Sequence, residues 1–162
     1  MPLEPGICLV LGASSGFGAA AARAFAAAGL DVCCVHLDRR ATLPLAEAVA
    51  RDVEKAGRRA LFFNVNATDA ARRAEVVQAL AQATQGGPGV RVLLHSLAFG
   101  TLRPLVASEA DEAVRPPQMA MTLEVMATSL VDWTQALLAA GLLERRARVF
   151  AMTSEGSRRG WP

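Results

Sequence analysis

The sequence of 162 residues contains no tyrosine, and its basic residues are almost all arginines. It also lacks a strong charge of one sign, since 17 basic and 15 acidic residues leave a net charge of +2 at pH 7. This balance predicts that neither nucleic acid nor a membrane surface is a partner. No apolar run reaches the roughly 18 residues of a membrane span, and residues 1–5 show no start of a secretion signal. We therefore expect a cytoplasmic protein.

Cysteine is scarce as well, with only Cys8, Cys33 and Cys34 in the chain. Each lies in an apolar, strand-like run, and their spacing matches no zinc motif. Neighbouring side chains of a strand point to opposite faces of the sheet, so Cys33 and Cys34 are expected on different faces. These residues are predicted to be buried thiols, and no metal site is expected.

What the sequence does contain is a glycine-rich turn between a predicted strand and a predicted helix. Residues 7–11 form a short apolar run, Gly12, Gly16 and Gly18 follow, and the alanine-rich residues 19–28 have high helix propensity. In such a unit the turn brings the backbone close to an anion, and the free N–H groups at the helix start supply donors. The pattern predicts a phosphate-binding site for a nucleotide.

Strand-like and helix-like segments alternate along the rest of the chain, with an irregular stretch over residues 102–117. Further strands are predicted at 32–37, 60–66, 90–95 and 148–152, and helices at 43–56, 68–84 and 119–143. This alternation predicts an α/β fold, a Rossmann-type doubly wound parallel sheet of order 3-2-1-4-5, in one nucleotide-binding domain over residues 1–162.

Ligands of such a sheet lie across the carboxyl ends of the strands, so the residues after each strand are candidates for binding. The hydroxyls of Ser14 and Ser15 can donate to phosphate or adenosine oxygens. Asp38 lies 20 residues beyond Gly18, at the separation where an acid binds the ribose hydroxyls of NAD, whereas Arg39 would pair with the 2′-phosphate of NADP. NADP is favoured over NAD.

The spacing Gly12-x-x-x-Gly16-x-Gly18 resembles the glycine motif of the short-chain dehydrogenase/reductase family, with Leu11 in place of the usual threonine. The resemblance extends over essentially the whole chain. It implies an oxidoreductase in which hydride passes from NAD(P)H to a carbonyl or an enoyl thioester. The cofactor-binding residues that it implies in the motif are Gly12, Ser14, Ser15, Gly16, Phe17 and Gly18.

Two further strand ends carry the resemblance. Asn64-Val65 resembles the Asp-Val pair of the family, which frames the adenine ring. The stretch His95-Ser96-Leu97-Ala98-Phe99 resembles the His-Ser-Ile-Ala-Phe stretch of the enoyl-acyl-carrier-protein reductase branch, which packs along the cofactor. Ser96, Leu97 and Ala98 are therefore implied to bind the cofactor.

The last predicted strand is followed by Ser154, in a segment that resembles the Ile-Ser-Ser-x-x-Gly region around the family's catalytic serine. This serine would position a substrate carbonyl, while a tyrosine donates the proton and a lysine lowers the pKa of that tyrosine. The sequence has only Lys55, far from the last strand, and the missing pair would be expected just beyond Pro162. We therefore expect these residues to be the N-terminal portion of a family domain of roughly 250 residues.

Two functions remain open at this point. If a C-terminal part supplies tyrosine and lysine, the protein reduces a small molecule, either a ketone or an acyl thioester of fatty acid metabolism. Alternatively, it is a catalytically inactive nucleotide-binding or scaffold protein. Family members are often tetramers, so the resemblance also implies a homo-oligomer.

Overall fold

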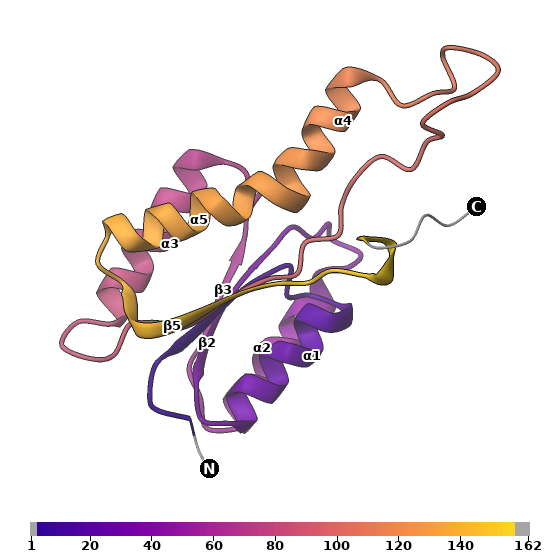
Figure 1. Cartoon of the computed structure of the whole chain (residues 1–162). Coiled ribbons are helices and arrows are strands. Elements are labelled where there is room, and N and C mark those ends of the chain that lie inside the picture. The colour runs from indigo at the N-terminus through magenta and orange to yellow at the C-terminus, as the bar shows by residue number, and fades with distance from the viewer. Residues whose placement is uncertain (1–2, 158–162) are drawn as a thin grey trace.

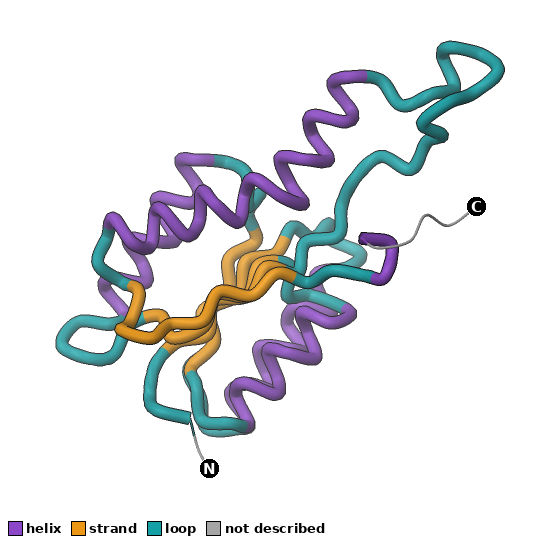
Figure 2. The backbone as a smooth tube through the Cα atoms, viewed as in Figure 1, coloured by secondary structure: helices purple, strands orange, loops and turns teal. Residues whose placement is uncertain are grey.

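A five-stranded parallel sheet lies between two layers of helices in the computed structural model, which describes residues 3–157 (Figures 1 and 2). The strands are β1 (Ile7–Leu11), β2 (Asp31–His36), β3 (Ala60–Asn64), β4 (Val90–His95) and β5 (Leu143–Ala151). The helices are α1 (Gly16–Ala27), α2 (Leu43–Lys55), α3 (Ala70–Ala83), α4 (Pro116–Leu123) and α5 (Ser129–Ala139), with a π-helical turn at Glu124–Thr128 and a 3₁₀ turn at Glu155–Ser157. The strand order is β3-β2-β1-β4-β5, which confirms the predicted topology.

Each face of the sheet has its own apolar core. On one face, small alanines of α1 and Val49 and Val53 of α2 pack against Val10 and Cys34. On the other face, α3 and α5 cover Leu9 and Cys33, and Trp133 of α5 is fully buried in this core. The two adjacent cysteines therefore do point to opposite faces, as the pleat of a strand requires. Burial raises the pKa of both thiols, so they stay protonated and serve as packing groups.

The last helix and strand differ most from the sequence prediction. The helix predicted at 119–143 begins at Pro116, contains the π-helical turn, and ends at Ala139, close to Gly141 with its positive φ of 65°. The strand predicted at 148–152 begins five residues earlier, at Leu143. Val90 of β4 pairs with Leu143 whereas Val92 pairs with Arg148, so extra residues of β5 bulge out between the two pairs.

This arrangement places the ends of four strands beside one another. Parallel strands share one carboxyl edge, and the segments that follow β1, β2, β3 and β4 all leave the sheet there. The helix pair α4 and α5 runs along one face and extends past this edge, where it joins the long loop over residues 99–115 (Figure 1). Among the described residues no helix is long and apolar enough to cross a membrane.

Candidate functional site

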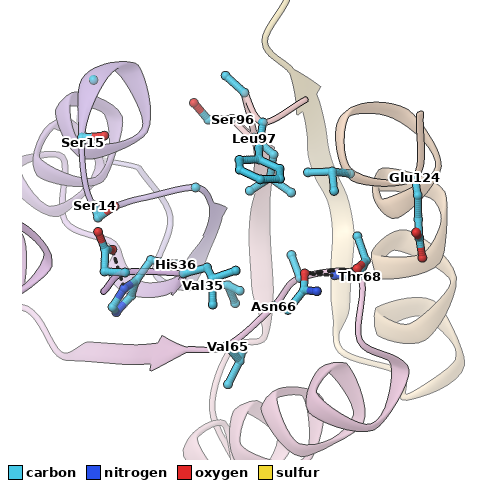
Figure 3. A pocket seen from close by; sticks show the side chains of 18 of the residues that line it. Ser14, Ser15, Val35, His36, Val65, Asn66, Thr68, Ser96, Leu97 and Glu124 are labelled. Carbon is cyan, nitrogen blue, oxygen red and sulfur yellow. Dashed lines mark hydrogen bonds and ion pairs between the residues drawn. The ribbon is translucent and has the colours of Figure 1, made fainter. Parts of the chain in front are cut away.

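A pocket of about 760 Å³ opens at the carboxyl edge of the sheet (Figure 3). Its size is typical of a small-molecule or cofactor site. The predicted cofactor-binding residues that line it are Gly12, Ser14, Ser15, Gly16, Phe17, Asp38, Arg39, Val65, Ser96, Leu97 and Ala98. The predicted residues Gly18, Asn64 and Ser154 lie outside its lining.

The glycine turn forms the floor of the pocket on the α1 side. Gly12 has a φ of +86°, and a Cβ there would collide with the carbonyl oxygen of Ser96 on the neighbouring strand end. A Cβ at Gly18 would collide with the carbonyl oxygen of Gly12. These two glycines therefore allow the first turn of α1 to sit directly on the end of β1, which explains how Gly18 contributes without lining the cavity.

The start of α1 faces the pocket without a side-chain cap. Ser15 is the N-cap residue in an extended conformation, and its hydroxyl makes no capping hydrogen bond. The first turn of α1 contains no acidic residue. The N–H groups of this turn and the positive end of the helix dipole are therefore available to an anion in the pocket.

The end of β2 carries a hydrogen-bonded pair of side chains, His36 and Asp38, that the sequence spacing did not reveal. His36 Nδ1 lies 2.8 Å from Asp38 Oδ2, and the two side chains are only 4% and 8% exposed. Burial alone would raise the pKa of the Asp38 carboxyl, but hydrogen bonds from Thr42, Ser14 and His36 hold it below its ordinary value. Asp38 is therefore ionised at neutral pH, and one oxygen of its carboxylate is bound by His36.

Asn64 holds the same segment from β3. Its Oδ1 accepts a hydrogen bond from the Asp38 N–H at 2.9 Å, and its Nδ2 donates to the Asp38 carbonyl oxygen at 3.0 Å. The resemblance implied a contact between Asn64 and adenine, but here both polar atoms of this side chain bind the backbone of the β2–α2 loop. Arg39 follows Asp38, lines the pocket and is exposed.

The opposite wall of the pocket comes from the helix that begins at Pro116, and its residues Glu124 and Val125 were not among the predicted site residues. Met121 of α4 and Glu124 and Val125 of the π-helical turn line the cavity. Figure 3 shows the Glu124 side chain on this wall, across the pocket from Ser14 and Ser15. A π-helical turn inside an α-helix is frequent at functional sites, but no residue pattern announces it.

A buried polar contact connects this wall to the sheet. His95 Nε2 lies 2.9 Å from the Ser129 hydroxyl, which donates to the Val125 carbonyl oxygen at 2.8 Å. Since the hydroxyl proton is used in that bond, Nε2–H of His95 is the donor to Ser129. Burial lowers the pKa of His95, so the ring is neutral. His95 thus has a structural partner and does not line the pocket.

The candidate catalytic serine, Ser154, is not among the residues that line the cavity. Ser154 is exposed and stands between β5 and the 3₁₀ turn. Lys55 is in the last turn of α2, which runs back to the amino edge of the sheet, and it pairs with Asp52 at 3.7 Å. The only lysine of the sequence is therefore at the end of the sheet opposite the pocket.

The strand order and the two helix layers define a Rossmann-type α/β domain with a doubly wound parallel sheet. The family model described as Enoyl-(Acyl carrier protein) reductase matches residues 12–162. Because this match covers most of the sequence, the chain belongs to the short-chain dehydrogenase/reductase family, to which that model refers. A search of curated proteins found no match.

Solved structures agree with this assignment. A short-chain dehydrogenase/reductase from Serratia marcescens is 25% identical, and the match has a TM-score of 0.78 and covers 98% of this chain and 59% of that one. A short-chain dehydrogenase from Burkholderia cenocepacia in complex with NADP is 27% identical, with a TM-score of 0.66 and coverage of 88% and 52%. A 3-oxoacyl-[acyl-carrier protein] reductase from Brucella melitensis, at 22% identity and a TM-score of 0.77, shares the fold, with coverage of 99% and 61%. The chain thus spans between 52% and 61% of the length of these relatives.

Proposed function

We propose that the pocket binds NADPH, with NADH as the weaker ligand, for a reductase of the short-chain type. The observation that carries this proposal is the uncapped start of α1, set on the end of β1 by Gly12 and Gly18 and open to a cavity of about 760 Å³. Backbone N–H groups and the helix dipole favour a pyrophosphate at this place. The Burkholderia cenocepacia relative, whose structure contains NADP, supports the cofactor class.

The lining residues fit the rest of a dinucleotide. Arg39, exposed beyond the β2 end, would pair with a 2′-phosphate on the adenosine ribose. Val65 offers an apolar surface to the adenine ring, while Leu97 and Ala98 would pack along the cofactor towards the nicotinamide. The hydroxyls of Ser14 and Ser15 would donate to phosphate oxygens.

The proposed reaction is reduction of a carbonyl or of an enoyl thioester. When bound, the reduced nicotinamide would supply the hydride. Ser154 would hydrogen-bond the substrate oxygen and so stabilise the developing negative charge. The proton donor would be a tyrosine assisted by a lysine, outside these 162 residues, because the sequence contains no tyrosine and Lys55 is at the far edge of the sheet. The substrate would be a small molecule, with an acyl thioester as one option, and the protein would act as a homo-oligomer.

A second candidate function rests on the absence of a tyrosine and of a suitably placed lysine from these 162 residues. A protein without the tyrosine and lysine pair would bind the nucleotide and lack a donor for reduction. It would then serve as a nucleotide-responsive or scaffold protein. The two candidates agree on cofactor binding and differ on turnover, so binding has to be measured first and turnover separately.

Calorimetric titration with NADPH and NADH tests the shared part of both candidates. Arg39→Ala is expected to weaken NADPH binding by roughly tenfold, about 1.4 kcal/mol, because a charge-assisted bond to the 2′-phosphate is lost, and to leave NADH unchanged. Arg40→Ala is the matched control, since Arg40 is an exposed arginine one residue further that does not line the pocket.

The outcomes separate the hypotheses. If neither nucleotide binds the unmodified protein, the nucleotide function is wrong. If both bind and Arg40→Ala weakens NADPH as much as Arg39→Ala, the assignment of the 2′-phosphate to Arg39 is wrong. Hydride transfer to a ketone or an enoyl thioester, followed by NADPH absorbance, then distinguishes the reductase from the inactive binding protein.

A further inference from the structure

Asp38 presents a contradiction at the adenosine end of the pocket. A carboxylate there would accept hydrogen bonds from the two hydroxyls of an unmodified ribose and would repel a 2′-phosphate. Arg39, the next residue, has the opposite preference. The sequence places both residues at the same strand end, so the geometry has to decide which of the two side chains meets the ligand.

In the structure the Asp38 carboxylate is largely buried, whereas the Arg39 side chain is exposed. Only 8% of the Asp38 side chain is exposed, and its Oδ2 is bound by His36 Nδ1 at 2.8 Å; Figure 3 marks this pair by the dashed line at His36. Ser14 and Thr42 lie near the carboxylate and, with His36, help to hold the pKa of Asp38 below its ordinary value. A largely buried carboxylate with one oxygen already bound by His36 has little exposed surface left to accept both hydroxyls of a ribose diol.

The surroundings keep this pair in place from both sides. The His36 ring is 4% exposed and packs against Phe62, with ring centroids 6.0 Å apart and a tilt of 57°. The backbone of Asp38 is bound by Asn64 through both its N–H and its carbonyl oxygen. Both residues line the pocket, but neither side chain can turn further into it without breaking these contacts. By contrast, Arg39 has no ion pair among residues 3–157 and remains free to reach a ligand.

We propose that His36 determines which nucleotide this site prefers, by holding the Asp38 carboxylate away from the adenosine ribose so that a 2′-phosphate is accepted. This inference rests on the proposed nucleotide function. His36 acts through Asp38 and is therefore a positioning residue. A 2′-phosphate carries between one and two negative charges, so a carboxylate turned towards it would oppose binding, whereas one that is largely buried and bound by His36 would oppose it much less.

Two adenosine halves of the cofactors, 2′,5′-ADP and 5′-ADP, probe this directly by calorimetry. The unmodified protein should bind 2′,5′-ADP more tightly. His36→Phe keeps an aromatic ring against Phe62 but removes the donor, so the carboxylate is expected to turn to the pocket and the ratio of the two affinities to fall at least tenfold. His36→Asn keeps a donor at the position of Nδ1 and should retain most of the original ratio.

The double variant His36→Phe/Asp38→Asn separates charge from packing. Without the negative charge at residue 38, the preference for 2′,5′-ADP should return, although the histidine is still missing. If the double variant stays as unselective as His36→Phe, the histidine acts through packing and the proposal is wrong. Circular dichroism and thermal unfolding establish that each variant is folded.

Asp38→Asn alone tests the masking even where His36→Phe fails to fold. A masked carboxylate should contribute little to ligand choice, so the affinity ratio should change less than threefold. A rise of more than tenfold in the preference for 2′,5′-ADP would mean that the ligand already meets the charge of Asp38, and would overturn the proposal. If the unmodified protein binds neither adenosine half nor either dinucleotide, it is the proposed nucleotide function that fails.

Discussion

At the scale of single residues, the shape of the pocket depends on the close approach between the backbone of Gly12 and that of Gly18. The carbonyl oxygen of Gly12 occupies the place where a Cβ of residue 18 would stand, so the turn closes only with glycine at that position. A neighbouring glycine, Gly16, lines the cavity and would put its Cβ into open space. The glycines of this motif therefore differ in their physical role: Gly18 permits the tight packing of the turn, whereas Gly16 borders the cavity.

Gly18→Ala is expected to displace the first turn of α1, because the clash is with a backbone atom that cannot rotate away. The free energy of unfolding should fall by about 1–3 kcal/mol, as for other overpacked sites, and NADPH affinity should fall at least tenfold. Gly87→Ala is the control, since its Cβ would meet only one atom, 3.8 Å away, far from the pocket. Equal NADPH affinity of Gly18→Ala and the unmodified protein, by calorimetry, would show that the turn does not hold the nucleotide.

Another single-residue contact predicts a pH dependence of stability. The Asp31 carboxylate accepts hydrogen bonds from the Arg59 N–H and Nε, at 3.0 and 2.6 Å. Burial alone would raise the pKa of Asp31, but the hydrogen bonds and charge of Arg59 hold it below its ordinary value. A lowered folded pKa means that the unfolded chain binds the proton more readily, so this contribution is present above about pH 4 and is lost as pH falls through the folded pKa.

Asp31→Asn should therefore lower the free energy of unfolding by about 1 kcal/mol at pH 7 and by much less at pH 3. Urea unfolding at the two pH values measures this difference. Glu75→Gln is the control, because its ion pair with Arg72 involves side chains that are 60% and 54% exposed and is expected to contribute little. A loss that is the same at both pH values would contradict the electrostatic origin.

At the scale of elements, the wall of the pocket depends on how the helix after residue 115 meets the end of β4. The π-helical turn at Glu124–Thr128 brings Glu124 and Val125 to the cavity. Directly after it, the buried Ser129 binds both the Val125 carbonyl oxygen and the ring of His95. This contact joins the helix to the sheet beside the pocket.

Ser129→Ala should destabilise the protein by about 1–3 kcal/mol, because a buried His95 nitrogen loses its partner. Thr134→Val is the matched control, since the Thr134 hydroxyl also donates to the carbonyl oxygen four residues earlier, here Leu130, at 2.7 Å. Within residues 3–157 that hydroxyl has no second side-chain partner, so its loss should cost less than about 1 kcal/mol. Thermal unfolding of both variants measures the difference, and equal losses would contradict the role of His95.

At the scale of the whole molecule, apolar side chains remain exposed on the helix layer. Val131 and Leu138 of α5 are 55% and 67% exposed, and their separation of seven residues puts them on one face of the helix. Exposed apolar stripes of this kind are typical of protein–protein interfaces. The proposed homo-oligomer would use this face of α5.

Leu138→Glu should therefore shift the protein to smaller species in sedimentation velocity without changing the unfolding temperature by more than a few degrees. Leu102→Glu is the control, since Leu102 is fully exposed on the long loop. If Leu138→Glu leaves the sedimentation profile unchanged, or if Leu102→Glu alters it to the same extent, the α5 face is not the interface.

The order of the strands could be predicted because the information for it is local. Apolar runs such as residues 7–11 and 90–95 alternate with helical segments, and right-handed crossovers leave few topologies for such a pattern. The bounds at Ala139 and Leu143 were missed because the end of α5 and the bulge of β5 depend on pairing with β4, which lies far away in the sequence. The family resemblance, confirmed by the match over residues 12–162, followed from the same local motifs.

The sequence by itself determined the fold class, the glycine turn and the strand ends at which a nucleotide would lie, since each depends on neighbours within a few residues. Only the tertiary structure decided what the polar side chains there do. It turned Asp38 towards His36, bound Asn64 to the backbone of the β2–α2 loop, and brought Glu124 to the opposite wall. These choices depend on distances between strands and helices far apart in the chain, and such distances exist only once the sheet has been assembled.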